Sequence, residues 1–235
     1  MNPGPVNVTP RVRQALSGPD LCHREKEFSD LLGHVRQKLL RIFGIANTHT
    51  AVVLTGSGMA AVEAMLSSFA EKGKKILVLS NGVYGERLRH ILEVHDVAVN
   101  VLSGGPGDFP ATAQIELLLK RDRAIDGIAM VHHETSTGML NPLPAVAALA
   151  KKYGKTLLVD AISSIGAETI DFTDIGFLAG SSGKCLHGYP GLSFVIVSKK
   201  EAKNLAGKRP GSLYLDLYGA LESEERNETP FTPAV

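Results

Sequence analysis

The chain has 235 residues, with 25 Lys and Arg against 24 Asp and Glu, and a formal net charge of +1. This balance argues against a basic nucleic-acid groove or a polybasic membrane patch, so we expect no nucleic-acid and no membrane partner. The length suits one large domain, or one domain with an appendage. High aliphatic content, 24 glycines and no tryptophan are typical of an α/β enzyme.

Cysteine usage and hydropathy indicate the compartment. Cys22 and Cys185 are too few for a disulfide framework, which favours a reducing environment. No apolar run approaches the roughly 20 residues that span a bilayer. The start, Met-Asn-Pro-Gly-Pro, has neither the charged nor the apolar region of a signal peptide. We therefore expect a soluble cytoplasmic protein.

Short apolar runs alternate with helical stretches along most of the chain. Residues 1–10 predict an extended arm, and the spacing of apolar residues over 24–43 predicts an amphipathic helix. Strands are predicted at 51–54, 76–79, 97–101, 127–131, 156–159, 175–179 and 192–197, and helices at 59–69, 84–94, 111–121 and 143–153. This alternation indicates an α/β fold with a mostly parallel seven-stranded sheet and helices on both faces.

The last two predicted strands are joined differently from the others. The connection between 175–179 and 192–197 is too short for a helical crossover, which predicts one antiparallel strand in a mixed sheet. Beyond residue 203 the pattern changes, with a loop over 207–212 and a new element from 213. The charged runs at 72–75 and 222–226 predict solvated faces.

Candidate functional residues follow several of the predicted strands, where open α/β sheets bind ligands. Thr-Gly-Ser-Gly at 55–58 joins a strand to a helix N-terminus, so it is either an anion cup or a simple tight turn. It is too short for a Walker loop, and Ala61 replaces the third glycine of a dinucleotide fingerprint. Tyr84 lies in a glycine-flanked loop, and Asp160 ends a strand, where a helix N-cap is the alternative.

Lys184 lies among small residues between two apolar runs. A lysine shielded from water loses its proton more readily, and the free amine attacks carbonyl groups. The alternative is a turn lysine whose ammonium reaches solvent.

A phosphate cup, an aromatic platform, a carboxylate and such a lysine together meet the requirements of pyridoxal 5'-phosphate. The lysine forms a Schiff base, the carboxylate keeps the pyridine nitrogen protonated, and ring stacking contributes roughly 0.5–1.5 kcal/mol.

The same stretches carry a resemblance to a known family. The chain resembles the class V, fold-type I aminotransferases, and within them most closely the 2-aminoethylphosphonate–pyruvate transaminases. The matching segments are 3–5, 55–64, 80–87, 128–142, 159–164, 181–191 and 215–218. The resemblance implies a fold-type I large domain, a homodimer, an amine donor and a 2-oxo acid as substrates, and transfer of the amino group of 2-aminoethylphosphonate to pyruvate.

The resemblance also implies a role for each matching position. Lys184 is the Schiff-base lysine and the acid–base group of the proton shift, and Asp160 pairs with the pyridinium nitrogen. The remaining cofactor-binding positions are Tyr84 and Ile162 on the two ring faces, Thr135 near the ring hydroxyl, Ser57, Gly58 and Met59 at the phosphate, and Thr232, or Thr229, at the phosphate of the neighbouring subunit.

Two features depart from the family pattern. Gly183 replaces the Asn or Gln that relatives commonly carry before the lysine. Relatives also continue into a small C-terminal domain whose arginine binds the acidic group of the substrate, and that domain is expected to be absent here. We therefore predict an N-terminal arm over 1–20, a cofactor-binding large domain over 21–212, and over 213–235 the start of the connection to the missing domain.

Other functions stay open on the sequence. The scaffold also suits a serine/alanine–glyoxylate or –pyruvate aminotransferase, or a truncated cofactor-binding remnant without turnover. Cysteine desulfurases usually stack a histidine where Tyr84 lies. His132 and His133 are adjacent on a predicted strand and point to opposite faces, so we expect no metal site.

Overall fold

A computed structural model describes residues 4–71, 73–208 and 210–233 of the chain. Its helices are α1 Pro10–Ala15, α2 Lys26–Ile42, α3 Gly58–Phe69, α4 Val83–Val94, α5 Thr112–Arg121, α6 Leu143–Tyr153, α7 Lys199–Leu205 and α8 Leu217–Glu225. Its strands are β1 His49–Thr55, β2 Lys75–Ser80, β3 Ala98–Ser103, β4 Gly127–Val131, β5 His133–Glu134, β6 Met139–Leu140, β7 Thr156–Asp160, β8 Phe177–Ser181 and β9 Leu192–Ser198. Over these ranges, no helix combines the length and the apolar character needed to cross a membrane.

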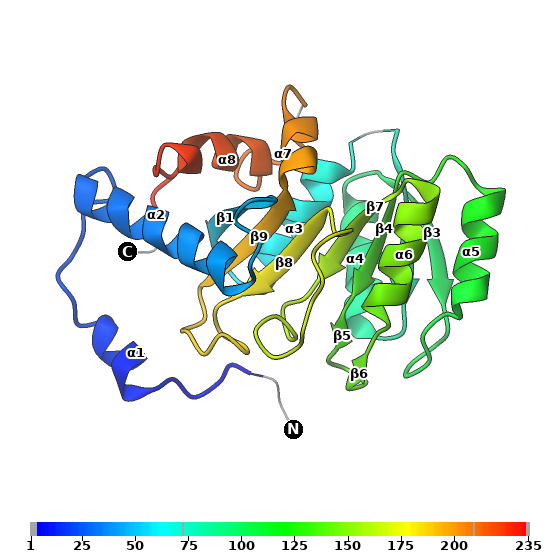
Figure 1. Cartoon of the computed structure of the whole chain (residues 1–235), viewed down its shortest axis with the longest axis horizontal. Helices are drawn as coiled ribbons and strands as arrows, with labels where there is room; N and C mark the ends of the chain where they lie inside the picture. The colour runs from blue at the N-terminus through cyan, green and yellow to red at the C-terminus, as the bar shows by residue number, and fades with distance from the viewer. Residues whose placement is uncertain (1–3, 72, 209, 234–235) are drawn as a thin grey trace.

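Seven strands form the central sheet in the order β1-β9-β8-β7-β4-β2-β3 (Figure 1). β9 is antiparallel to both of its neighbours, and the other pairs are parallel. The predicted mixed seven-stranded sheet with one antiparallel strand is therefore confirmed. In the parallel region Val131 pairs with Asp160, and Asp160 with Ala179, so β4 and β7 end side by side and β8 continues two residues further, to Ser181.

Helices cover both faces of the sheet, as predicted (Figure 1). Alternating strand residues point to opposite faces, so Val78 joins the core under α3, α4, α7 and α8, whereas Leu77 and Leu79 join the core under α2, α5 and α6. Strands that are buried on both faces need continuous apolar sequence. This requirement explains why unbroken runs such as 76–79 marked the strands in the sequence.

The structure adds elements that the sequence pattern did not reveal. The N-terminal arm contains helix α1, which Thr9 caps through a hydrogen bond from Val12 N–H to its hydroxyl. The short hairpin of β5 and β6 follows β4, and β8 begins two residues later than expected, at Phe177.

Three of the predicted stretches extend outside the described residues. They are the Pro-Gly-Pro stretch at Pro3, the charged run at Lys72, and the last residues of the 213–235 segment.

The prediction that both charged runs are solvated is wrong for Glu224 and Lys74. In α8, Leu217, Ala220, Leu221 and Glu224 follow helical spacing and face the core together, so Glu224 is only 1% exposed. Lys74 Nζ lies 3.8 Å from the centroid of the Phe69 ring, and burial lowers its pKa. Charge density along the sequence does not show which member of a run the helix turns inward.

Candidate active site

A cavity of about 570 Å³ opens at the carboxyl edge of the sheet, beside the loop that joins β8 to β9. Four of the predicted site residues line it: Ser57, Gly58, Ile162 and Lys184. They come from three separate segments of the chain. Asp160 and Thr135 contact segments beside this cavity through the hydrogen bonds described below, and Met59 follows Gly58 in the first turn of α3. Tyr84 and the threonines near the C-terminus do not line the cavity.

The proposed anion cup forms where β1 ends and α3 begins. Ser57 is the N-cap of α3, and no side-chain hydrogen bond caps the helix. Ala60 N–H donates to the carbonyl of Ser57 at 2.8 Å, which leaves the N–H groups of Gly58 and Met59 without a partner in the helix. Gly56, with φ of +148°, donates its N–H to the carbonyl of Gly191 at 2.7 Å. A Cβ at Gly58 would lie 2.5 Å from Ile162 Cδ1, so Ile162 packs directly on the start of the helix. The positive end of a helix and free N–H groups are suited to a phosphate.

Asp160 lies at the end of β7 with only 4% of its surface exposed. Its Oδ1 accepts a hydrogen bond from Ile162 N–H at 3.0 Å, and no other described residue donates to this carboxylate. The pKa of Asp160 is raised to about 6, mainly by burial and in part by the negative charge of Glu134, against the opposing effects of the Ile162 N–H and Arg87. A buried carboxylate with one unused oxygen is a binding partner for a cationic N–H group.

Ser163 connects the Asp160 loop to the end of β5. Its hydroxyl donates to the carbonyl of His133 at 3.0 Å and lies 2.9 Å from Thr135 Oγ1. Cys185, the residue after Lys184, donates its thiol to the carbonyl of Ser163 at 3.5 Å. Ser163 thus brings Thr135, the Asp160 loop and the lysine loop together.

Glu134 positions Tyr84 from 50 residues away. Its fully buried carboxylate accepts hydrogen bonds from Tyr84 N–H at 3.2 Å and Gly85 N–H at 3.0 Å, at the first turn of α4. A Cβ at Gly82 would lie 2.5 Å from the Glu134 side chain, so this approach requires the glycine. A carboxylate at a helix N-terminus is favoured by the helix dipole. Sequence reasoning missed this role, because the cap and the helix belong to distant segments.

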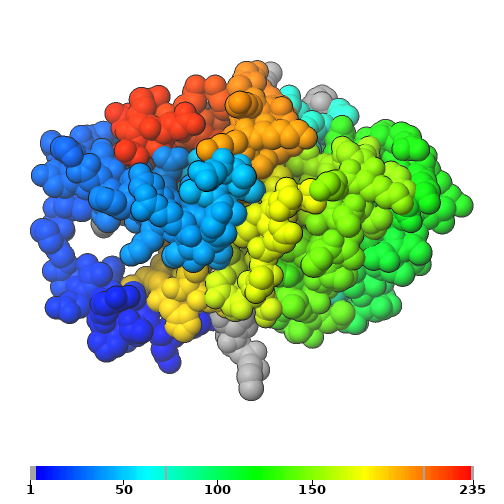
Figure 2. All heavy atoms as spheres, viewed as in Figure 1, coloured from blue at the N-terminus to red at the C-terminus, as the bar shows by residue number. Residues whose placement is uncertain are grey.

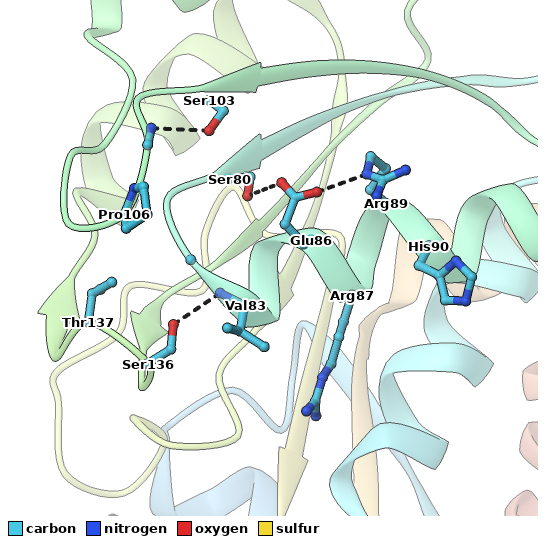
Figure 3. Close-up of a pocket in the computed structure, with 12 residues that line it drawn as sticks. Ser80, Val83, Glu86, Arg87, Arg89, His90, Ser103, Pro106, Ser136 and Thr137 are labelled. Atoms are coloured by element: carbon cyan, nitrogen blue, oxygen red, sulfur yellow. Dashed lines mark hydrogen bonds and ion pairs between the residues drawn. The ribbon is translucent and has the colours of Figure 1, made fainter.

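Arg87 is a second residue that the sequence analysis missed. Its guanidinium lies 4.7 Å from the centroid of the Tyr84 ring, a cation–π distance. Figure 3 shows a neighbouring cavity of about 610 Å³ along α4, and there Arg87 points away from Glu86 and Arg89. The positive charge of Arg87 lowers the pKa of Asp160, so Arg87 influences the electrostatics of the proposed site.

Lys184 lies half-buried in the loop between β8 and β9. Within this loop Ser182 Oγ donates to the carbonyls of Tyr189 at 2.5 Å and Leu192 at 2.9 Å. A side chain at Gly183 would meet Pro190 at 3.1 Å, so the residue before the lysine is closely packed. Lys184 Nζ donates to the carbonyl of Gly4 at 3.1 Å. In Figure 2 the dark blue N-terminal segment lies beside the yellow loop.

The threonines near the C-terminus lie apart from this cavity. Thr232 is exposed and lines a smaller cavity of about 40 Å³, which also includes Thr55. Thr229 is buried, and its hydroxyl has no hydrogen-bond partner among the described residues. Their predicted contact with the phosphate of another subunit therefore stays a prediction.

The two histidines after β4 bind consecutive serines. His132 is buried with Nδ1 3.0 Å from Ser164 Oγ, and His133 Nδ1 lies 3.1 Å from Ser163 Oγ. Burial lowers the pKa of His132, which favours the neutral ring. In the part of the chain that the structure describes, no three His, Cys, Asp or Glu side chains gather as metal ligands.

Comparison with known protein families identifies the scaffold. The model of the family "Aminotransferase class-V" matches residues 14–234. The chain belongs to this family. The similarity that the sequence motifs suggested therefore extends over nearly all of this class-V aminotransferase chain.

Curated relatives narrow the similarity within the class-V family. The chain is 40% identical over 230 residues to a 2-aminoethylphosphonate–pyruvate transaminase from Klebsiella pneumoniae, with 97% of this chain and 62% of the relative covered. It is 41% identical over 219 residues to the same enzyme from Pseudomonas aeruginosa, with 92% and 58% covered. The chain thus spans about three-fifths of the length of these relatives.

Solved structures of two aminotransferases share the fold. Ureidoglycine–glyoxylate aminotransferase from Bacillus subtilis superimposes with a TM-score of 0.90 at 29% identity, covering 99% of this chain and 62% of that enzyme. Alanine–glyoxylate aminotransferase from Nostoc sp. gives a TM-score of 0.88, also at 29% identity, covering 97% and 62%. The fold-type I scaffold is therefore shared with enzymes that differ in their named substrates.

Proposed function

We propose that this chain carries the pyridoxal-phosphate site of a transaminase that transfers the amino group of 2-aminoethylphosphonate to pyruvate, giving phosphonoacetaldehyde and alanine. The observation that carries the proposal is the placement of Lys184, Ile162 and the start of α3 around one cavity, with the buried Asp160 bound to Ile162 N–H. These residues fit a flat group that is anionic at one end and cationic at the other.

Each end of that group would meet a matched partner. The N–H groups of Ser57, Gly58 and Met59 would hold the phosphate at the positive end of α3, and the unused oxygen of Asp160 would accept the pyridinium N–H. Burial raises the pKa of this carboxyl to about 6, and a neighbouring cation favours its ionised form. We infer that Tyr84 and Ile162 would enclose the ring and that Thr135 would bond near its hydroxyl.

Lys184 would carry out the proton transfer. Pyridoxal phosphate, when bound, supplies an electron-accepting ring that acidifies the hydrogen on the amino-bearing carbon of the donor. Lys184 Nζ, at the wall of the cavity, would take this proton and return it on the way to product. Asp160 would hold its negative charge at the ring nitrogen throughout, which keeps the ring electron-poor.

The relatives support the phosphonate substrate over glyoxylate-linked transamination. Identity is 40–41% to the two 2-aminoethylphosphonate–pyruvate transaminases named above and 29% to the two glyoxylate-linked enzymes of known structure. The relatives continue beyond the region that this chain matches, and the proposed reaction would also use residues of that further region. The expected homodimer belongs to the same proposal, and sedimentation velocity of the purified chain measures it.

Absorbance spectroscopy tests the proposal. Adding pyridoxal phosphate to the chain should produce a band near the edge of the visible range, and Lys184→Ala should abolish it. The band should then bleach with 2-aminoethylphosphonate. Bleaching with alanine alone would favour the glyoxylate-linked reaction, and a band that no amine bleaches would indicate a cofactor-binding chain without turnover. Failure to form the band would refute all three functions.

A further inference from the structure

The first described residues of the chain lie against the loop that carries Lys184 (Figure 1). Lys184 Nζ donates to the carbonyl of Gly4 at 3.1 Å across 180 positions of sequence, and Val6 N–H donates to the carbonyl of Gly183 at 3.4 Å. Pro5, between these two contacts, lines the same cavity as Lys184. The N-terminal segment, residues 4–6, thus forms part of the cavity wall.

The approach of Gly4 to the lysine loop is close enough to require glycine. Gly4 is buried with φ of +150°, a conformation that L side chains rarely adopt. A Cβ at this position would lie 2.9 Å both from the backbone oxygen of Gly183 and from Cδ of Lys184. Neither atom is the free end of a flexible side chain, so a larger residue must displace the segment or the loop.

The contact bears on the reactivity of Lys184. The hydrogen bond directs Nζ at the carbonyl oxygen of Gly4. Attack on a carbonyl compound requires the free amine, with its lone pair directed at the carbonyl carbon. Nζ therefore has to turn away from the carbonyl of Gly4 to approach the carbonyl carbon that it attacks.

We propose that the carbonyl of Gly4 is a positioning group for Lys184, which tethers Nζ to the N-terminal segment in the cofactor-free chain. Nζ leaves this tether when it reacts with a carbonyl compound. In that reaction nitrogen attacks the carbonyl carbon, a C=N bond forms, and both amine hydrogens leave with the oxygen as water. The inference rests on the proposed role of Lys184 as the reacting amine, and it adds the N-terminal segment to the site.

Reductive methylation of the cofactor-free chain tests the tether. Formaldehyde supplies the carbonyl and cyanoborohydride the hydride, and mass spectrometry follows methylation of Lys184. Gly4→Ala should raise the rate at Lys184 about tenfold, the effect of losing one hydrogen bond. The control is Gly105→Ala, which also places a side chain at positive φ, here +92°, but in open space. Equal rates at Lys184 in wild type and Gly4→Ala would overturn the proposal.

Hydrogen exchange provides a second measurement that does not depend on Gly4→Ala folding. Lys184→Met keeps the side-chain bulk but removes the donor, so exchange at the amide of Val6 should accelerate about tenfold. Lys155→Met is the matched control, because Lys155 Nζ also donates to a backbone carbonyl, that of Arg123, at 3.1 Å. Unchanged exchange at Val6 would contradict the tether. Neither measurement uses pyridoxal phosphate, so a failed absorbance titration leaves these results standing.

Discussion

Arg36 and Glu224 form a buried ion pair, with Nε 3.1 Å from Oε2, that joins α2 to α8 at the edge of the sheet. The pair also serves edge strand β1. Arg36 Nε donates to the carbonyl of Ala51 at 2.9 Å, and Val53 N–H donates to Glu224 at 2.9 Å. These two side chains therefore bind the backbone groups that an edge strand leaves free. Burial raises the pKa of Glu224 to about 8 and lowers that of Arg36.

Removing one partner of this pair should destabilise the chain. In Glu224→Ala the guanidinium of Arg36, 12% exposed, loses its counter-ion, and the N–H of Val53 loses its acceptor. We expect the free energy of unfolding to fall by about 3–5 kcal/mol, the usual cost of breaking a buried pair. Urea denaturation at pH 9, where the Glu224 carboxylate is ionised, measures it. Glu225→Gln, an exposed neighbour, is the control and should change stability by less than about 0.5 kcal/mol. Equal stability of the two variants would show that the pair contributes nothing.

The buried carboxylate of Asp160 should make the stability of the cofactor-free chain depend on pH. Its pKa is about 6 in the folded chain against 3.8 as the ordinary value, so the folded state binds this proton more tightly than the unfolded state. The contribution is therefore present below pH 3.8 and is lost as pH rises through 6. Its full size is about 3 kcal/mol, from 1.36 kcal/mol for each pKa unit.

The difference in stability between Asp160→Asn and wild type isolates this titration. Asparagine does not ionise, so the variant should gain stability relative to wild type between pH 4 and 7, by up to about 3 kcal/mol. Denaturation at several pH values measures the difference, in which the other titrating groups cancel. A constant difference across this range would mean that Asp160 ionises in the folded chain as readily as in the unfolded chain.

Local sequence signals predicted the helices well where caps are present in the sequence. Helix α6 has the predicted bounds, because Pro144 suits its first turn and Gly154, with φ of +64°, provides the left-handed residue that ends it. The parallel sheet followed from the alternation of apolar strands and helices. The placement of Asp160 and Lys184 at strand ends followed from the same pattern.

Contacts between distant segments could not be predicted in this way. Glu134 caps α4 across 50 residues, and Gly4 meets Lys184 across 180. The Glu134 contact depends on β2 lying beside β4, and the Gly4 contact on where the N-terminal arm lies, and periodicity specifies neither. Burial of Glu224 was missed for another reason. A run of charged residues predicts a solvated surface, and the run alone does not show which of its side chains faces the core.

Glu134→Gln should weaken cofactor binding by moving Tyr84. The amide keeps the size of the side chain but removes the negative charge that accepts the N–H groups of Tyr84 and Gly85. Hydrogen bonds to a charged group contribute about 1.5–3 kcal/mol, so we expect the dissociation constant for pyridoxal phosphate to rise about tenfold or more. Spectroscopic titration measures it, and Glu93→Gln at the far end of α4 is the control. An unchanged constant would show that the cap does not position the ring of Tyr84.

Arg87→Met should raise the pKa of Asp160 further above 6. The positive charge of Arg87 lowers this pKa and opposes burial and the charge of Glu134, so its loss leaves only the opposing Ile162 N–H. Methionine keeps an apolar contact with the Tyr84 ring. Carboxyl carbon NMR of the cofactor-free chain follows the titration directly. Arg89→Met is the matched control, because the Arg89 guanidinium is already paired with Glu86 at 2.9 Å and Glu93 at 2.5 Å. If both variants left the Asp160 titration where it is in wild type, the charge of Arg87 would have no influence on the site.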